Sequence, residues 1–299
     1  DHPLPTTTTS GRRQHWGEEL RAGRPSVRCP LVLLLPGKDN RFDHLHLMSA
    51  VYANLGYRVL SVKAEFTCTA RKICAAQASV HPWVSLWEAC LWLVRRNKFH
   101  YMVDRVVEAL EEFDQLAPSE GWRDYLTSGP TGLVEPTWDK IILAGYSEGA
   151  NQQAYNSRIV PSLGSIYYSG GGDGERPLIA LPSTDTTCDQ VDMSAEDCKT
   201  RGPAAWMYPG LTPSQRRVGY SHSGENCDFT MPFTLDGIPE GEQPFHAVKD
   251  DITSLSFFDG EARLLRTDTE DGTHTSVAGV SQAMALVHTY LMCKAGGLS

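Results

Sequence analysis

Residues 141–155 read IILAGYSEGANQQAY, and this stretch decides the fold. An apolar run leads into the pentapeptide Gly145-Tyr146-Ser147-Glu148-Gly149, and a segment typical of a helix follows it. A serine on a sharp strand-to-helix turn, flanked by glycines two residues away, is the arrangement that presents a nucleophilic hydroxyl. The amide of Glu148 would then lie at the positive end of the helix, where an oxyanion can bind. The sequence therefore predicts that Ser147 is a catalytic nucleophile.

The rest of the chain alternates short apolar segments with segments of helical periodicity. Strands are expected at residues 31–35, 57–62, 139–144, 163–168, 217–221 and 262–266, and helices at residues 45–55, 83–96, 101–115 and 276–293. The first strand, Leu31-Val32-Leu33-Leu34-Leu35, is apolar throughout, which is typical of a parallel strand buried on both faces. Gly56 is expected to end the first helix. Strands that alternate with helices predict an α/β fold with a mostly parallel, doubly wound sheet.

The domain organisation follows from length and local composition. The 299 residues, 41% of them hydrophobic, are enough for one large domain. Residues 1–26 are rich in Thr, Arg and Gly and lack periodicity, so they are predicted to form an N-terminal arm. Residues 27–299 are predicted to form the domain itself. Within it, Gly, Pro, Thr and Asp dominate from about residue 170 to 215, which indicates a loop-rich cap inserted over the sheet.

Charge and hydropathy exclude several classes of partner. The net charge of -9 argues against nucleic acid or an anionic membrane as the main partner. No apolar stretch is long enough to cross a bilayer, so no integral membrane segment is expected. No C-x-x-C or H-E-x-x-H motif is present, so neither a metal site nor a cofactor is predicted.

The eight cysteines indicate an oxidising compartment. Two pairs lie close together in polar, loop-like sequence, Cys68 with Cys74 and Cys188 with Cys198. Each pair is a candidate disulfide that would staple a short loop. A secreted or periplasmic protein is therefore predicted, with a cytosolic enzyme carrying buried thiols as the alternative.

A nucleophilic serine needs a general base, and in this type of fold the acid and then the histidine follow the serine along the chain. Four histidines follow Ser147, namely His222, His246, His274 and His288. His274 lies in a polar loop directly before the last predicted helix, where an imidazole can hang over the carboxyl edge of the sheet, so it is favoured. His222, at the end of a predicted strand, is its rival. His288 lies inside the last helix and is expected to be structural, and His246 is expected to begin a helix.

The acid is expected on the loop that follows the predicted strand at residues 217–221. Glu225 lies nearer the strand end and is ranked first, with Asp228 as the alternative. A second oxyanion donor is expected in the turn after the first strand, where the backbone amide of Lys38 is assigned that role and Gly37 shapes the turn.

Two tyrosines are predicted to contact the substrate. Tyr146 stands next to the serine in sequence. Tyr168 ends the strand expected beside the elbow, where that strand could border the acyl site.

The chain resembles the α/β-hydrolase superfamily. The resemblance rests on Leu33-Leu34-Leu35-Pro36-Gly37, on the elbow at residues 145–149, on the post-strand Glu225 and on the pre-helix His274. It implies an α/β-hydrolase fold and a serine esterase or lipase that transfers an acyl group from a small-molecule or polymer ester to water, without a cofactor. A serine peptidase, amidase or thioesterase on the same fold is the alternative within enzymes. A noncatalytic binding protein that kept the fold is the alternative outside them.

Overall fold

A computed structural model of the chain describes residues 30–37, 42–62, 86–129, 132–170, 210–222, 246–248, 264–267 and 282–297. Within these residues, one sheet contains seven strands. They are β1 (Leu31–Leu35), β2 (Arg58–Ser61), β5 (Ile141–Tyr146), β6 (Gly164–Tyr168), β7 (Arg217–His222), β8 (His246–Val248) and β9 (Leu264–Thr267). Their order is β2-β1-β5-β6-β7-β9-β8, and every neighbouring pair is parallel. The predicted parallel α/β architecture is confirmed.

The strand order changes direction between β1 and β5. The chain passes from β1 outward to β2, and then returns to β5 on the other side of β1. From β5 the sheet grows toward the opposite edge through β6 and β7. In open parallel sheets, ligands bind outside the carboxyl ends of the strands at such a switch point. Both β1 and β5 end there, at Leu35 and Tyr146.

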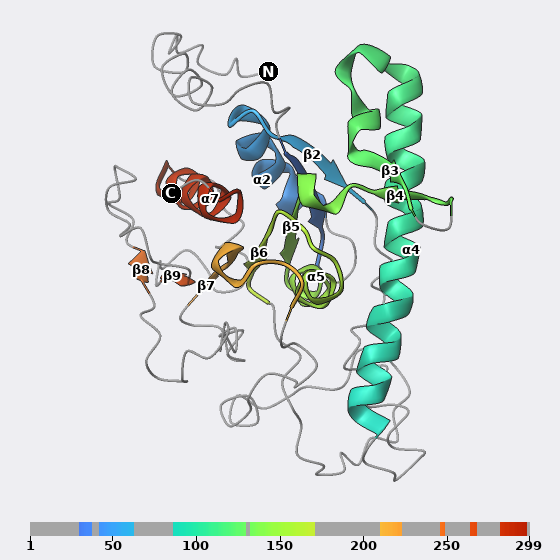
Figure 1. Cartoon of the computed structure of the whole chain (residues 1–299). Helices are drawn as coiled ribbons and strands as arrows, with labels where there is room; N and C mark the ends of the chain where they lie inside the picture. Colours follow the sequence, from blue (N-terminus) through green and yellow to red (C-terminus); the bar gives the residue numbers. More distant parts are fainter. Residues whose placement is uncertain are drawn as a thin grey trace, which may run out of the picture.

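Helices cover both faces of the sheet (Figure 1). On one face, α2 (Phe42–Asn54) and α7 (Gln282–Ala295) pack against the even-numbered residues of β1, Val32 and Leu34. On the other face, α4 (Leu86–Leu116) and α5 (Glu148–Ile159) lie over the sheet, and α4 packs against the odd-numbered residues of β1. All five β1 side chains are fully buried, because alternate side chains enter opposite cores. This explains the continuous apolar run.

Most predicted elements lie close to their observed bounds, and two expectations were wrong. The helices expected at residues 83–96 and 101–115 form the single helix α4, because residues 97–100 contain neither Gly nor Pro to end it. His246 begins strand β8 rather than a helix. The expected stop after α2 is confirmed, since Gly56 has a φ of 88°, which favours glycine.

Smaller elements connect α4 to β5. The 3₁₀ turns η2 (Pro118–Glu120) and η3 (Trp122–Tyr125) are followed by an antiparallel hairpin of β3 (Leu126–Ser128) and β4 (Val134–Pro136), and then by η4 (Trp138–Lys140). A further turn, η6 (Ser214–Arg216), precedes β7. The predicted N-terminal arm and most of the predicted cap lie outside the described residues. Within the described ranges, no helix combines the length and the apolar character that a bilayer crossing requires.

Candidate functional site

The turn after β5 holds Ser147 in a backbone conformation that few non-glycine residues adopt. Its φ is 54° and its ψ is -120°, close to the values at the first central position of a type II′ turn, where glycine is preferred. Ser147 and Ser169 are the non-glycine residues with positive φ in the described part of the chain. The Ser147 N–H donates to the Tyr168 carbonyl oxygen at 2.8 Å, and its own carbonyl accepts from the Asn151 N–H at 3.1 Å. The neighbouring backbone therefore fixes this conformation from both sides.

Glycine is required on both sides of Ser147 by close backbone contacts. A Cβ atom at Gly145 would collide with the Gly149 carbonyl oxygen, since the strand and the helix meet there. A Cβ atom at Gly149 would collide with the carbonyl oxygens of Leu35 and Pro36. The G-x-S-x-G pattern thus has a steric reason, because α5 starts directly against the ends of β1 and β5.

Ser147 is also the accessible point in a buried stretch. Residues 141–157 are all described, and each of them is buried except Ser147, which is partly exposed. The strand before Ser147 and the helix after it are buried, so Ser147 is the residue of this stretch that solvent can reach. A strained, partly exposed serine on a strand-to-helix turn is the local structure of a nucleophile elbow.

The turn that follows β1 lies against the elbow. A Cβ atom built on Gly37 would lie 3.1 Å from Ser147 Cβ and 3.3 Å from Tyr146 Cδ1. The backbone at Gly37 therefore passes close to Ser147. Lys38 itself lies outside the described residues.

Glu148 begins α5, so its N–H is among the first four of the helix, which have no acceptor within the helix. Its side chain is buried and forms an ion pair with Arg95 of α4, which is also fully buried. The Arg95 Nη1 atom lies 2.7 Å from Glu148 Oε1, and Nη2 lies 3.3 Å from Oε2. Lys98 Nζ lies 3.2 Å from Oε1.

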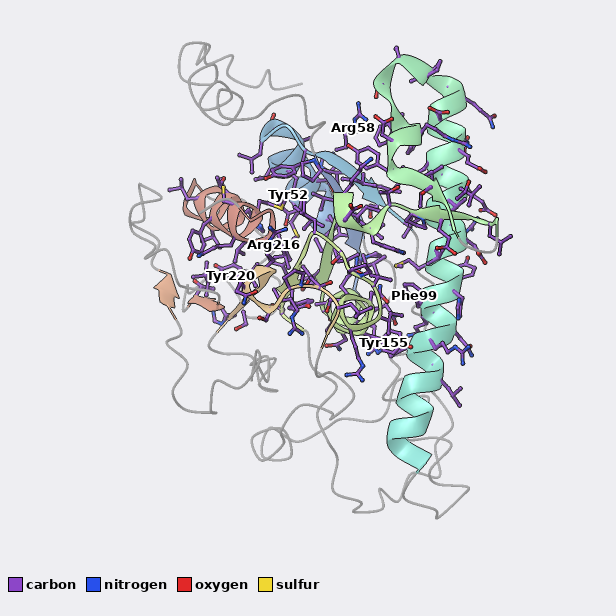
Figure 2. The ribbon with its side chains drawn as sticks, in the orientation of Figure 1. Tyr52, Arg58, Phe99, Tyr155, Arg216 and Tyr220 are labelled. Carbon is purple, nitrogen blue, oxygen red and sulfur yellow. The ribbon has the colours of Figure 1, made fainter. Side chains whose placement is uncertain are left out.

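Arg95 was not among the residues predicted for the site, although the sequence carries a signal for it. Residues 95, 99, 102, 106 and 110 follow helical spacing on α4, and the last four are Phe99, Met102, Val106 and Leu110. Phe99 lies on the side of α4 that faces the sheet (Figure 2). A charged residue in line with such an apolar stripe indicates a buried charge with a partner.

His274, Glu225 and Asp228 lie outside the described residues, so their roles remain predictions. The rival base, His222, is the last residue of β7 and is 7% exposed.

The two predicted substrate contacts occupy different positions from those expected. The Tyr146 side chain is 5% exposed and lies in the core between the sheet and α2 and α7. The Tyr168 side chain is fully buried in that same core, and its hydroxyl accepts from the Tyr52 hydroxyl at 2.6 Å. Tyr52 comes from α2, on the side facing α7 (Figure 2). Tyr168 borders the elbow through its backbone carbonyl, so a side-chain contact with substrate would require it to leave the core.

His288 completes this buried cluster from α7. Its Nδ1 atom lies 3.0 Å from the Tyr168 hydroxyl oxygen, and its Nε2 atom has no hydrogen-bond partner among the described residues. Burial lowers the pKa of His288 from 6.5 to about 4, so the ring is neutral at physiological pH. This agrees with the expectation that His288 is structural.

No metal cluster or disulfide is visible where the structure can be described. No group of three or more His, Cys, Asp or Glu side chains that could hold a metal ion occurs among the described residues. The four candidate disulfide cysteines, Cys68, Cys74, Cys188 and Cys198, fall outside those residues.

No protein-family model matches this chain, and no match was found among curated proteins or solved structures. The function is therefore inferred from the geometry of the turn at Ser147 and from the order of the strands in the sheet.

Proposed function

We propose that the protein is a serine hydrolase of the α/β-hydrolase type that cleaves carboxylic esters. The observation that carries this proposal is Ser147, which is strained and partly exposed on a buried strand-to-helix turn at the switch point of a parallel sheet. Backbone strain of this kind persists where the surrounding structure imposes it, and it is concentrated at functional sites. A structural serine would need neither the positive φ nor the exposure.

In the proposed reaction, Ser147 attacks the acyl carbon while the His274 imidazole takes its proton. The carbonyl oxygen becomes an oxyanion, held by the backbone amides of Glu148 and Lys38. Collapse of this intermediate breaks the ester bond, and the leaving alcohol takes the proton from His274. Water then attacks the acyl-enzyme in the same way and releases the acid. Glu225, or Asp228 in its place, orients the imidazole and stabilises it when it is protonated.

The strand order supports this assignment of the base and acid. The end of β7 is two strand spacings from the end of β5, or about 10 Å. Glu225 is three residues past His222, the last residue of β7, and three extended residues span up to about 10 Å. β9 is one strand further away, or about 14 Å from β5. His274 is seven residues past Thr267, enough chain for a span of up to about 24 Å.

The environment and the substrate class are proposed from the sequence. Eight cysteines support export to a secreted or periplasmic location, with disulfides Cys68–Cys74 and Cys188–Cys198. The proposed substrate is a small-molecule or polymer ester, and no cofactor is needed for this chemistry.

A fluorophosphonate probe and short-chain p-nitrophenyl esters test the proposal. The wild-type protein is expected to be labelled by the probe and to hydrolyse the esters, and Ser147→Ala to do neither. Ser128→Ala is the matched control, because Ser128 is exposed at the end of β3 and is expected to behave like the wild type. Equal rates of ester hydrolysis by the wild type and Ser147→Ala would refute the proposal that the protein is a serine hydrolase acting through Ser147. Absence of labelling and turnover in a folded wild type would favour a noncatalytic binding protein. Faster cleavage of an amide or a thioester than of the matching ester would instead indicate a peptidase or a thioesterase.

A further inference from the structure

We propose that Arg95 and Glu148 form a positioning pair for the reaction at Ser147. Arg95 holds the residue whose backbone amide would bind the oxyanion, and it neutralises the carboxylate beside that amide. This inference rests on the proposed function, because the oxyanion belongs to that reaction. Both side chains act through the backbone of the elbow rather than by touching the reacting atoms.

The carboxylate of Glu148 is held on both of its oxygens. The guanidinium of Arg95 contacts it as a fork, with Nη1 on Oε1 at 2.7 Å and Nη2 on Oε2 at 3.3 Å. Lys98 donates to Oε1 at 3.2 Å, and Asn151 Nδ2 donates to Oε2 at 3.4 Å. A planar fork fixes the orientation of a carboxylate as well as its distance. Because the carboxylate and the amide belong to the same first residue of α5, a fixed side chain restricts the position of the amide.

Arg95 also contacts α5 one turn further along. The Gln152 Nε2 atom donates to the Arg95 backbone carbonyl at 3.0 Å, and Arg95 Nη1 donates to Gln152 Oε1 at 3.4 Å. From the other side, Gln153 Nε2 donates to the carbonyls of Leu33 at 2.9 Å and Ala144 at 3.1 Å. The start of α5 is therefore attached to α4 on one side and to β1 and β5 on the other.

These contacts set position more effectively than they add stability. Further along α4, the helix packs through the apolar side chains Met102, Val106 and Leu110, so an apolar contact was available in this fold. A buried ion pair is often no more stabilising than apolar residues of the same volume. What it supplies is direction and distance, which a hydrophobic contact specifies loosely. Oxyanion donors must be held within about 0.5 Å of the productive geometry, so the site benefits from that precision.

The pair also removes a charge that would oppose the reaction. Glu148 directly follows Ser147 and is buried, so an uncompensated negative charge on its side chain would oppose an oxyanion at the elbow. Like charges repel strongly where water is excluded. Arg95 and Lys98 compensate the carboxylate, which leaves the positive end of α5 available to the oxyanion.

The same substitution at two positions on α4 tests this proposal. Arg95→Lys keeps the charge and removes the planar fork. Arg105→Lys is the matched control, because Arg105 pairs with Glu108 at 3.2 Å on the exposed part of the same helix. The readouts are the rate constant for labelling of Ser147 by a p-nitrophenyl phosphonate, expressed per folded molecule, and kcat and KM for the ester. Arg95→Lys is expected to lower the labelling rate constant and kcat by about 10- to 100-fold with little change in KM. Arg105→Lys is expected to stay within about twofold of the wild type.

A double variant separates position from stability if Arg95→Lys does not fold. Arg95→Met with Glu148→Gln replaces the ion pair by neutral groups of similar size, a change that buried pairs often tolerate. It is expected to fold and still to react slowly, because the fork that fixes the side chain of residue 148 is gone, although Gln152 and Gln153 keep their backbone partners. Wild-type rates in either folded variant would overturn the proposal while leaving the serine hydrolase intact. A wild type without labelling at Ser147 would refute the proposed function and this inference with it.

Discussion

Replacing Ser147 by glycine is expected to stabilise the protein while it abolishes any reaction at this position. Ser147 has a φ of 54° and a ψ of -120°, which glycine adopts without a steric penalty. Ser147→Ala provides the reference, because it also lacks the hydroxyl but keeps the Cβ atom that causes the strain. The difference between the two variants therefore isolates the backbone conformation from the side-chain chemistry.

The size of the difference follows from two opposing terms. Strain at a non-glycine residue in such a region costs of order 1–3 kcal/mol in the folded state. Glycine loses about 0.4–1 kcal/mol more than alanine in conformational entropy on folding. Ser147→Gly is thus expected to exceed Ser147→Ala in unfolding free energy by about 1 kcal/mol, or about 1–2 °C in Tm for a chain of 299 residues.

Urea denaturation and thermal unfolding of the two variants, followed by circular dichroism, measure this difference. Both variants are expected to be unreactive toward a fluorophosphonate, which shows that the gain in stability is unrelated to activity. A Ser147→Gly variant that is no more stable than Ser147→Ala would refute the claim that the elbow stores strain. A matched pair at an unstrained exposed site, Ser128→Gly and Ser128→Ala, should show the opposite order.

Further predictions concern acidity, packing and redox state. Because His288 binds a proton at about pH 4 when folded and near pH 6.5 when unfolded, stability present above about pH 6.5 should fall by roughly 3 kcal/mol as the pH drops to 4. When unfolding free energy is measured against pH, the wild type should lose this stability between pH 6.5 and 4 and His288→Phe should not. The same pH dependence in both proteins would contradict the prediction. Gly149→Ala should lose about 1–3 kcal/mol and most phosphonate labelling, because its Cβ atom meets backbone on β1; wild-type values for both would rule this out. Peptide mapping without reductant should recover Cys68–Cys74 and Cys188–Cys198, each worth about 2–3 kcal/mol, whereas free thiols at these positions would exclude both bridges.

The local pattern of the sequence was sufficient for the central sheet and the elbow. The apolar run at residues 31–35 and the strand-turn-helix at residues 141–155 carry their own signals, namely continuous burial and the two glycines. Both signals depend on neighbours in sequence or on simple periodicity. The two helices expected at residues 83–96 and 101–115 form one helix, Leu86–Leu116. Nothing in residues 97–100 stops helical hydrogen bonding.

The side-chain environment of the site depended on contacts far apart in sequence. Glu148 and Arg95 are separated by 53 positions, and only the packing of α4 beside α5 brings them together. Tyr168 was expected at the substrate because its strand borders the elbow, yet strand alternation turns its side chain into the core beside α7. The position of a residue along a strand predicts where its backbone carbonyl lies. The face of the sheet that its side chain occupies depends on the register of the strand.

The inward face of α5 has a consequence for how the protein folds. Beside the apolar Ala150, Ala154 and Tyr155, its buried side chains include the polar Glu148, Gln152, Gln153 and Asn156. Gln153 bonds to carbonyls on both β1 and β5, so its partners are in place only after those two strands have paired. Because these hydrogen bonds require the paired strands, we expect the turn that carries Ser147 to be completed only after β1 and β5 have paired. Any reactivity of Ser147 would then report on the fully formed molecule, since partly folded chains would lack it.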